Sequence, residues 1–283
     1  MLYRGFSQAE LEREYSPSSM IGGDLAPYLA SYQALSAQAR AELPVQANLA
    51  YGDTPAQVLD FFPAKGAGAP LHVFIHGGYW QDLSQRESAM MAPALIQAEQ
   101  SFATLNYTLA PDARLDQMVD ECRDALLWLA SQAGALGFDP TRITLSGHSA
   151  GAHLASMVMA SSAGALARAG LRVRDVLLIS GVYDLEPVSL TSVNDPLHLT
   201  PVEVNDLSPI RNLPPPGPRY HVSVGERDTG EFIRQSRDYA ERLRKAGHSV
   251  SFALKHGMFR RVRLPHPWRW SRQSRWPRFR DAG

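Results

Sequence analysis

Short apolar runs of strand length recur between residues 58 and 254, and longer amphipathic stretches separate them. The sheet signal is strongest over Val58–Phe62, His72–His76, Ser101–Asn106, Arg142–Ser146, Val173–Ser180, Arg219–Val224 and Val250–Leu254. Between these runs, Arg114–Ala130 and Glu231–Ala246 place apolar residues on one helical face. Alternating strands and helices are typical of a mostly parallel sheet with helices on both faces, so the pattern predicts an α/β fold.

Two regions, one before the first expected strand and one between two later strands, depart from this alternation. Residues 8–15 and 25–41 carry apolar positions at helical spacing and predict a helical arm within residues 1–45. Residues 185–218 hold eight prolines, which indicates a long excursion that could form part of a substrate cap. Because no internal repeat or low-complexity linker interrupts residues 1–257, we expect a single domain there.

The last 26 residues differ in kind from the rest of the chain. Residues 258–283 hold eight arginines, one acidic residue and three of the five tryptophans, without helix or strand periodicity, which predicts a disordered basic tail. The remaining 257 residues carry seven more acidic than basic side chains, as an ordinary acidic enzyme does. A tail that binds nucleic acid or an anionic membrane is a weaker interpretation, so we expect neither as a partner.

Cysteine content and hydropathy bear on the compartment. Cys122 is the single cysteine, so an internal disulfide is ruled out, and residues 1–20 lack the apolar run of a secretory signal. No uninterrupted apolar stretch approaches the roughly 18–20 residues of a membrane-spanning helix. These features predict a soluble, cytoplasmic protein.

A glycine–serine turn follows the expected strand Arg142–Ser146. Gly147-His148-Ser149-Ala150-Gly151 fits the G-x-S-x-G elbow, which places a nucleophilic serine on a strained strand-to-helix turn. A glycine-rich turn with a buried serine could match by chance, but the small-residue run Ala150–Ala160 continues as a helix, as the elbow requires. The motif therefore predicts an α/β-hydrolase fold with Ser149 as nucleophile.

His76-Gly77-Gly78-Tyr79-Trp80 stands at the end of an earlier apolar strand. In this fold the loop at that point supplies one oxyanion-hole donor and the residue after the nucleophile supplies the other, so we expect Gly77, Gly78 and Ala150 to form the hole. His76 precedes the serine, against the order serine, acid, histidine, and is expected to orient the loop by a hydrogen bond. Tyr79 and Trp80 form an aromatic wall for a substrate ring or, alternatively, pack in the core.

The acid and the base should follow the last two strands. Asp228 comes directly after Tyr220–Val224 and would accept the imidazole N–H; its alternative role is to cap the next helix. Glu226 and Asp184 are weaker candidates for the acid. His256, which follows Val250–Leu254, is the candidate base, although a solvated histidine at a strand end is nearly as good an interpretation.

With these motifs, the sequence resembles the kynurenine formamidase (arylformamidase) family of α/β hydrolases. The resemblance rests on HGGYW at 76–80, GHSAGAHLA at 147–155, SGVYDLEP at 180–187, GERDTGEFIRQS at 225–236, and the stretches at 3–18 and 50–64. It covers about residues 1–257. It implies hydrolysis of an N-formyl arylamine such as N-formylkynurenine through a Ser-His-Asp triad, with no metal and no organic cofactor.

The sequence departs from this family where the base should lie. The family carries Asn-His-Phe or a similar triplet after the last strand, near position 260, whereas this chain reads Phe259-Arg260-Arg261 and lacks the closing helix. A reading-frame change near codon 258 would explain both differences. Alternatives to a formamidase are therefore a carboxylesterase for small aryl or acyl esters and a catalytically impaired scaffold. His266 is the other histidine in this region and the alternative candidate for the base. We expect a small-molecule substrate as the partner. The chain could also form a homodimer.

Overall fold

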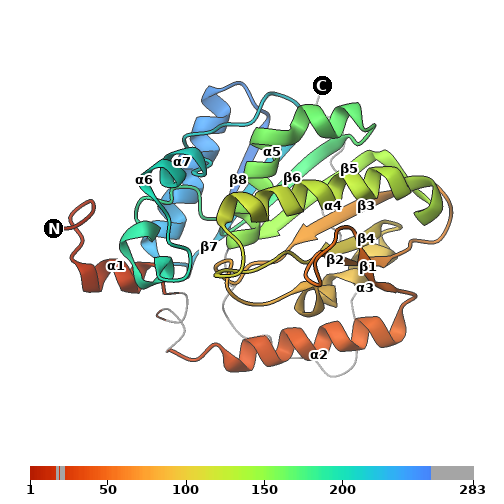
Figure 1. Cartoon of the computed structure of the whole chain (residues 1–283), viewed down its shortest axis with the longest axis horizontal. Coiled ribbons are helices and arrows are strands. Elements are labelled where there is room, and N and C mark those ends of the chain that lie inside the picture. Colours follow the sequence, from red (N-terminus) through yellow and green to blue (C-terminus); the bar gives the residue numbers. More distant parts are fainter. Residues whose placement is uncertain (17–18, 20–22, 256–283) are drawn as a thin grey trace.

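The computed structural model describes residues 1–16, 19 and 23–255, and residues 17–18, 20–22 and 256–283 fall outside that description. Its centre is one sheet, in which the described strands lie in the order β1-β2-β4-β3-β5-β6-β7-β8 (Figure 1). β2 is antiparallel to β1 and β4, and the other neighbouring pairs are parallel. The strands are β1 (Gln46–Ala50), β2 (Val58–Phe62), β3 (Ala69–Ile75), β4 (Ser101–Leu105), β5 (Phe138–His148), β6 (Val173–Ile179), β7 (Arg219–Gly225) and β8 (Val250–Lys255).

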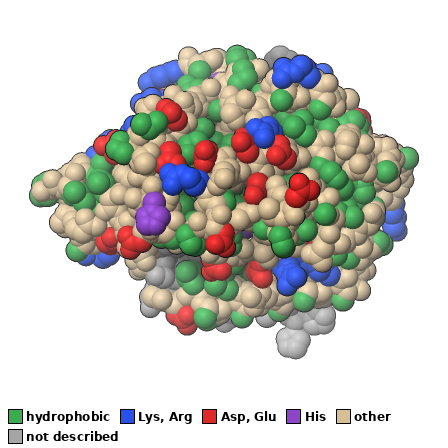
Figure 2. Space-filling view, in the orientation of Figure 1, with side chains coloured by type: hydrophobic (Ala, Val, Ile, Leu, Met, Phe, Trp, Pro, Cys, Tyr) green, Lys and Arg blue, Asp and Glu red, His purple; other side chains and the backbone are tan. Residues whose placement is uncertain are grey.

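Helices cover the two faces of the sheet. They are α1 (Gln8–Glu14), α2 (Ala26–Glu42), α3 (Ala92–Gln97), α4 (Leu115–Leu136), α5 (Ala150–Arg168), α6 (Pro201–Asp206) and α7 (Gly230–Lys245), with 3₁₀ turns η2 (Gln85–Met91), η3 (Val188–Leu190) and η4 (Ser192–Asn194). α4 and α5 lie together over the middle of the sheet, and α2 runs along the bottom of the molecule (Figure 1). Over the face seen in Figure 2, acidic and basic side chains lie close to one another, so the charge there is of mixed sign.

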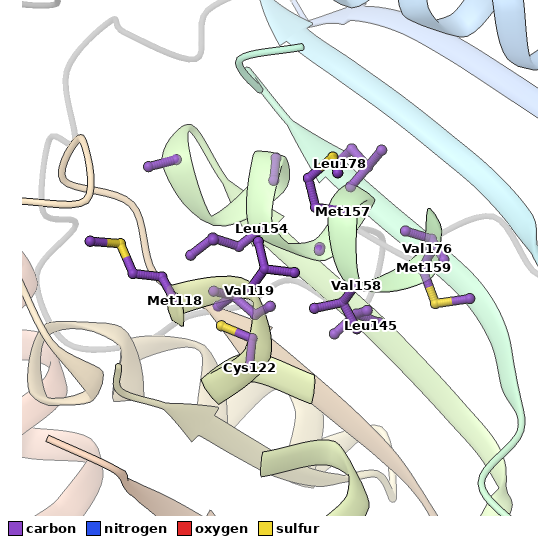
Figure 3. Close-up of a cluster of buried hydrophobic side chains, with 14 of the residues drawn as sticks. Met118, Val119, Cys122, Leu145, Leu154, Met157, Val158, Met159, Val176 and Leu178 are labelled. Carbon is purple, nitrogen blue, oxygen red and sulfur yellow. The ribbon is translucent and has the colours of Figure 1, made fainter. Parts of the chain in front are cut away.

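The pleat of β3 divides the core in two, because successive side chains of a strand point to opposite faces. Val73 and Ile75 belong to a large core with α4, α5 and α7, whereas Phe74 belongs to a smaller core with α2, η2 and α3. Figure 3 shows part of the large core, where side chains of α4, such as Cys122, face side chains of α5, such as Val158. Two layers of helices thus hold the middle strands on both faces.

α5 is the one described helix that is long and apolar enough to cross a membrane by length and composition. In the structure 67% of its most apolar window is buried, and the helix packs against β3, β5, β6 and α4. Its apolar character is therefore accounted for by its place in the core.

The α/β prediction is confirmed, and each of the seven expected strands is present. β3 starts three residues earlier than expected and ends at Ile75, which leaves His76 in the loop that follows. β1 was not among the expected strands, because its residues are almost all exposed and form no apolar run. The expected arm contains α1 and α2, and the proline-rich excursion at 185–218 contains η3, η4 and α6.

Candidate active site

β5 and α5 meet at Ser149, the single residue between the strand and the helix. Its φ of 54° and ψ of −118° are a strained conformation for a residue other than glycine. Flanking glycines make room for this turn: a Cβ on Gly147 would lie 2.2 Å from the carbonyl oxygen of Gly151, and one on Gly151 would lie 2.1 Å from that of Ile75. The backbones of β3, β5 and α5 therefore touch at the elbow, which has the geometry of a nucleophile elbow.

Backbone donors flank the serine. Ala150 is the first residue of α5, so its N–H is among those that have no partner within the helix, and it lies at the positive end of the helix dipole. Gly77 lies against the elbow from the other side, where a Cβ would be 2.8 Å from the His148 carbonyl oxygen and 3.2 Å from Ser149 Cβ. The structure thus brings together the loop after β3, the serine and the start of α5, as the motifs predicted.

The loop after β3 is fixed by its own backbone and by His76. Gly78 has φ +102°, and a Cβ there would lie 2.1 Å from the Asp82 carbonyl oxygen, so only glycine fits. His76 Nδ1 donates to the Gly77 carbonyl oxygen at 2.8 Å, and its ring stacks on Tyr107 with centroids 4.4 Å apart. Burial lowers the pKa of His76 to about 4, so the ring is neutral at pH 7. The expected loop-orienting hydrogen bond is present.

Asp228 lies in the turn between β7 and α7. Its Oδ2 accepts hydrogen bonds from Ser180 Oγ at 2.6 Å and from the Gly225 N–H at 2.9 Å. The N-cap of α7 is Thr229, and the two hydrogen bonds described for the Asp228 side chain lead to the ends of β6 and β7 instead of to the helix. The contacts of Asp228 therefore do not support the alternative in which this side chain caps α7.

The other two candidate acids have different surroundings. The Asp184 carboxylate accepts a hydrogen bond from Tyr3 Oη at 3.2 Å and pairs with Arg211 at 3.3 Å. Glu226 donates its backbone N–H to the Lys255 carbonyl oxygen at 3.1 Å, which ties the β7 turn to the end of β8. The Asp228 side chain is bonded to the ends of β6 and β7, at the edge of the sheet where the elbow lies.

The base predicted at His256, its alternative His266 and the segment 259–261 all lie outside the described residues. The structure does show where the chain leaves the sheet. β8 is parallel to β7 and ends at Lys255, paired with Gly225, three residues before Asp228. Lys255 consequently lies at the edge of the sheet that carries Ser149 and the Asp228 turn.

His148 is a titratable group that the sequence analysis did not single out. Part of its side chain faces solvent, yet the surrounding protein desolvates the ring and lowers its pKa, while the Asp228 carboxylate acts in the opposite direction. The ring is therefore neutral at pH 7 and close enough to Asp228 to interact with it. The sequence feature that could have drawn attention to His148 is its position directly before Ser149 in the elbow.

The two aromatic residues after Gly78 have different environments. Trp80 is 0% exposed and meets the ring of His153 edge-on, with centroids 5.0 Å apart, which favours the core-packing interpretation over a substrate wall. Tyr79 is partly exposed and donates its hydroxyl to the carbonyl oxygen of Tyr15 at 2.7 Å. Of the pair, Tyr79 alone has a surface that could contact a ligand.

Other reactive chemistry is sparse in the described part of the chain. Within it, no group of three or more histidine, cysteine, aspartate or glutamate side chains could hold a metal ion. Burial raises the pKa of the Cys122 thiol well above its ordinary value, so this thiol stays protonated inside the core.

Comparisons with known proteins agree with this geometry. The BD-FAE family matches residues 59–242. The kynurenine formamidase of Danio rerio is 32% identical over 262 residues, which are 88% of this chain and 88% of that protein. Esterase LipC of Mycobacterium tuberculosis is 27% identical over 70% of this chain and 55% of its own length. Among solved structures, a putative thioesterase from Silicibacter sp. tm1040 has a TM-score of 0.76, 27% identity, and coverage of 87% of this chain and 90% of its own.

The strand order and the serine elbow define an α/β hydrolase. Its relatives are hydrolases, and the similarity to the kynurenine formamidase extends over 88% of both chains. The chain belongs to the kynurenine formamidase family.

Proposed function

We propose that this chain hydrolyses the formamide bond of an N-formyl arylamine such as N-formylkynurenine, with Ser149 as nucleophile. The observation that supports this most directly is the contact of the Gly77 backbone with the elbow beside the free N-terminal N–H of α5. The similarity to a kynurenine formamidase over 88% of both chains points to an aryl formamide as substrate.

In the proposed reaction, Ser149 Oγ attacks the formyl carbon while its proton passes to a histidine. The carbonyl oxygen becomes an oxyanion, and the N–H groups of Ala150, Gly77 and Gly78 stabilise it. The C–N bond then breaks, the histidine protonates the departing arylamine, and a formyl ester remains on Ser149. The same histidine activates a water molecule, which releases formate and restores the serine.

Asp228 would orient that histidine and stabilise its protonated form. Both hydrogen bonds described for its carboxylate use Oδ2, which leaves Oδ1 to accept an imidazole N–H. β8 ends at Lys255, beside the Asp228 turn, which supports a search for the histidine shortly after that residue in the sequence. His256 is the candidate within this sequence.

An esterase is the second candidate, because the same nucleophile and oxyanion hole act on an ester carbonyl. The similarity to esterase LipC and to the putative thioesterase supports it. Purified protein should be assayed with N-formylkynurenine and with a 4-nitrophenyl ester of a short acid under the same conditions. A kcat/KM at least about tenfold higher for the formamide supports the proposal; the reverse order supports the esterase.

The third candidate is an impaired scaffold, and the base decides it. If His256 serves as base, His256→Ala should lower kcat by at least about a hundredfold. If instead this chain carries no base, it will hydrolyse both substrates poorly, and an Asn-His-Phe segment with a closing helix after Gly257 should raise the rate by orders of magnitude. A fast parent rate that His256→Ala leaves unchanged contradicts both and directs the search to His266.

We also propose a cytoplasmic location and a small-molecule substrate as the partner. The support is the single buried cysteine and the extent of similarity to a metabolic hydrolase. Fractionation of cells that express a tagged chain would test the location.

A further inference from the structure

The last turn of α1 lies between two loops of the proposed active site. One is the oxyanion loop, which we define as residues 77–82, and the other is the acid turn, residues 225–231. Glu14 and Tyr15 of the arm hydrogen-bond to both, although about 65 residues separate them from the first loop and more than 200 from the second. A segment that bonds to both loops can set their relative position.

Toward the acid turn, the arm supplies the cap of α7. Thr229 is the N-cap residue, yet its hydroxyl donates to the Glu14 carbonyl oxygen at 2.6 Å instead of capping its own helix. The Glu14 carboxylate accepts the N–H of Glu231 at 2.8 Å, and this donor is one of those that a helix start leaves without an internal partner. The start of α7 at Gly230, two residues after Asp228, is therefore held by Glu14.

Toward the oxyanion loop, the contact passes through Tyr15. Its carbonyl oxygen accepts the hydroxyl of Tyr79 at 2.7 Å, and Tyr79 directly follows Gly78. The Tyr15 side chain is 2% exposed, donates its hydroxyl to Glu231 at 3.0 Å and packs on the ring of Phe232 with centroids 6.0 Å apart. Tyr15 is consequently bonded to the loop through its backbone and to α7 through its side chain.

We infer that Glu14 and Tyr15 are positioning residues, which fix the position of the oxyanion loop relative to the acid turn at the nucleophile. The inference rests on the proposed function, in that Gly77, Gly78 and Asp228 are taken to act on the substrate. It adds that the N-terminal arm is part of the active-site framework. Loosening α1 should therefore loosen both loops together, although neither loop is changed.

Amide hydrogen exchange of the full chain tests this inference without the need for hydrolysis. Ser7→Ala removes the exposed N-cap of α1, whose capping box with Glu10 lies away from both loops. The matched control is Thr200→Ala, which removes the same kind of capping box from α6. Ser7→Ala should speed exchange about fivefold in residues 77–82 and in 225–231, the factor that corresponds to ~1 kcal/mol of lost capping. Thr200→Ala should change neither segment.

A second pair of variants acts at the contact itself. Thr229→Val removes the hydroxyl that bonds to Glu14 and should speed exchange in α1 and in residues 77–82, whereas Thr229→Ser keeps the hydroxyl and should restore slow exchange. The inference is overturned if exchange in residues 77–82 stays at the parent rate in both Ser7→Ala and Thr229→Val. A chain that fails to hydrolyse the formamide would contradict the proposed function, whereas the exchange rates test the role of the arm independently.

Discussion

The nucleophile side and the acid side of the site are built in different ways. Around Ser149, glycine backbones lie so close that an added Cβ would meet a carbonyl oxygen at 2.1 to 2.8 Å. Around Asp228, side-chain hydrogen bonds hold the turn, and they come from residues as far away in the sequence as Ser180 and Glu14. The backbone around Ser149 therefore has no room for larger side chains, whereas the position of the Asp228 turn depends on hydrogen bonds from distant parts of the chain.

The same difference decides which features of the site can be recognised in a short sequence segment and which depend on contacts between distant segments. The elbow at 147–151 and the HGGYW motif at 76–80 each consist of five consecutive residues, and β3 and β5 are neighbours in the sheet. The acid turn depends on Ser180 at the end of β6, on Glu14 of the arm and on the end of β8. The acid turn is therefore held by contacts between distant segments, whereas the elbow is held by the backbone geometry of neighbouring strands.

Ser149→Ala should have the largest effect on activity. Hydrolysis of either substrate should fall by at least about 10⁴-fold, because no described group replaces the nucleophile, while the melting temperature changes little. Where parent hydrolysis is slow, labelling with a fluorophosphonate reports the same loss. Ser161→Ala, in the same helix, is the control and should keep the parent rate. Equal activity in Ser149→Ala and parent would remove Ser149 from the mechanism.

Asp228→Asn tests the acid side. The amide preserves the shape but would hold a histidine in the wrong tautomer, so kcat should fall by about 10³–10⁴-fold. Asp238→Asn in α7 is the matched control, since Asp238 pairs with Arg234 on the outside of the helix. A decrease of less than about tenfold in the variant would assign the acid to another carboxylate, and Asp184→Asn would then be measured.

Gly151→Ala should break the elbow through its packing. The new Cβ would lie 2.1 Å from the Ile75 carbonyl oxygen, so β3 and α5 must separate, and we expect a loss of at least about 3 kcal/mol in the free energy of unfolding. Gly134→Ala in α4 meets open space and should stabilise by about 0.5–1 kcal/mol. Urea unfolding of both variants measures the difference, and equal stabilities would contradict the tight elbow.

Acid should destabilise the fold through three buried histidines. Burial lowers the pKa of His72, His76 and His153 to about 4, below the value near 6.5 that they have when unfolded. The unfolded chain therefore binds more protons between these values, and stability that is full above pH 6.5 is lost as the pH falls toward 4. Each histidine contributes up to about 3 kcal/mol to this loss.

Urea unfolding at several pH values measures this effect. His72→Gln should flatten the dependence by one proton, because it removes one of the three buried histidines. A parent stability that stays constant from pH 7 to pH 4.5 would contradict the burial argument.

The sequence predicted most of the sheet, because strands in the middle of an α/β fold are apolar on both faces and stand out as runs. β1 was missed since its residues are exposed, and it joins the sheet only through antiparallel pairing with β2. Trp80 shows the same limit: its neighbour Tyr79 is partly exposed while Trp80 is fully buried, and nothing in the five-residue motif distinguishes them.

The sequence by itself determined the fold class and the elbow. Both depend on local steric rules, in which glycines permit a turn that other residues cannot make. The tertiary structure decided that the Asp228 carboxylate bonds to the ends of β6 and β7, and it joined the arm to both loops of the site. These contacts connect residues up to 217 positions apart, as in the bond from Glu231 to Glu14, and local propensity carries no information about such partners.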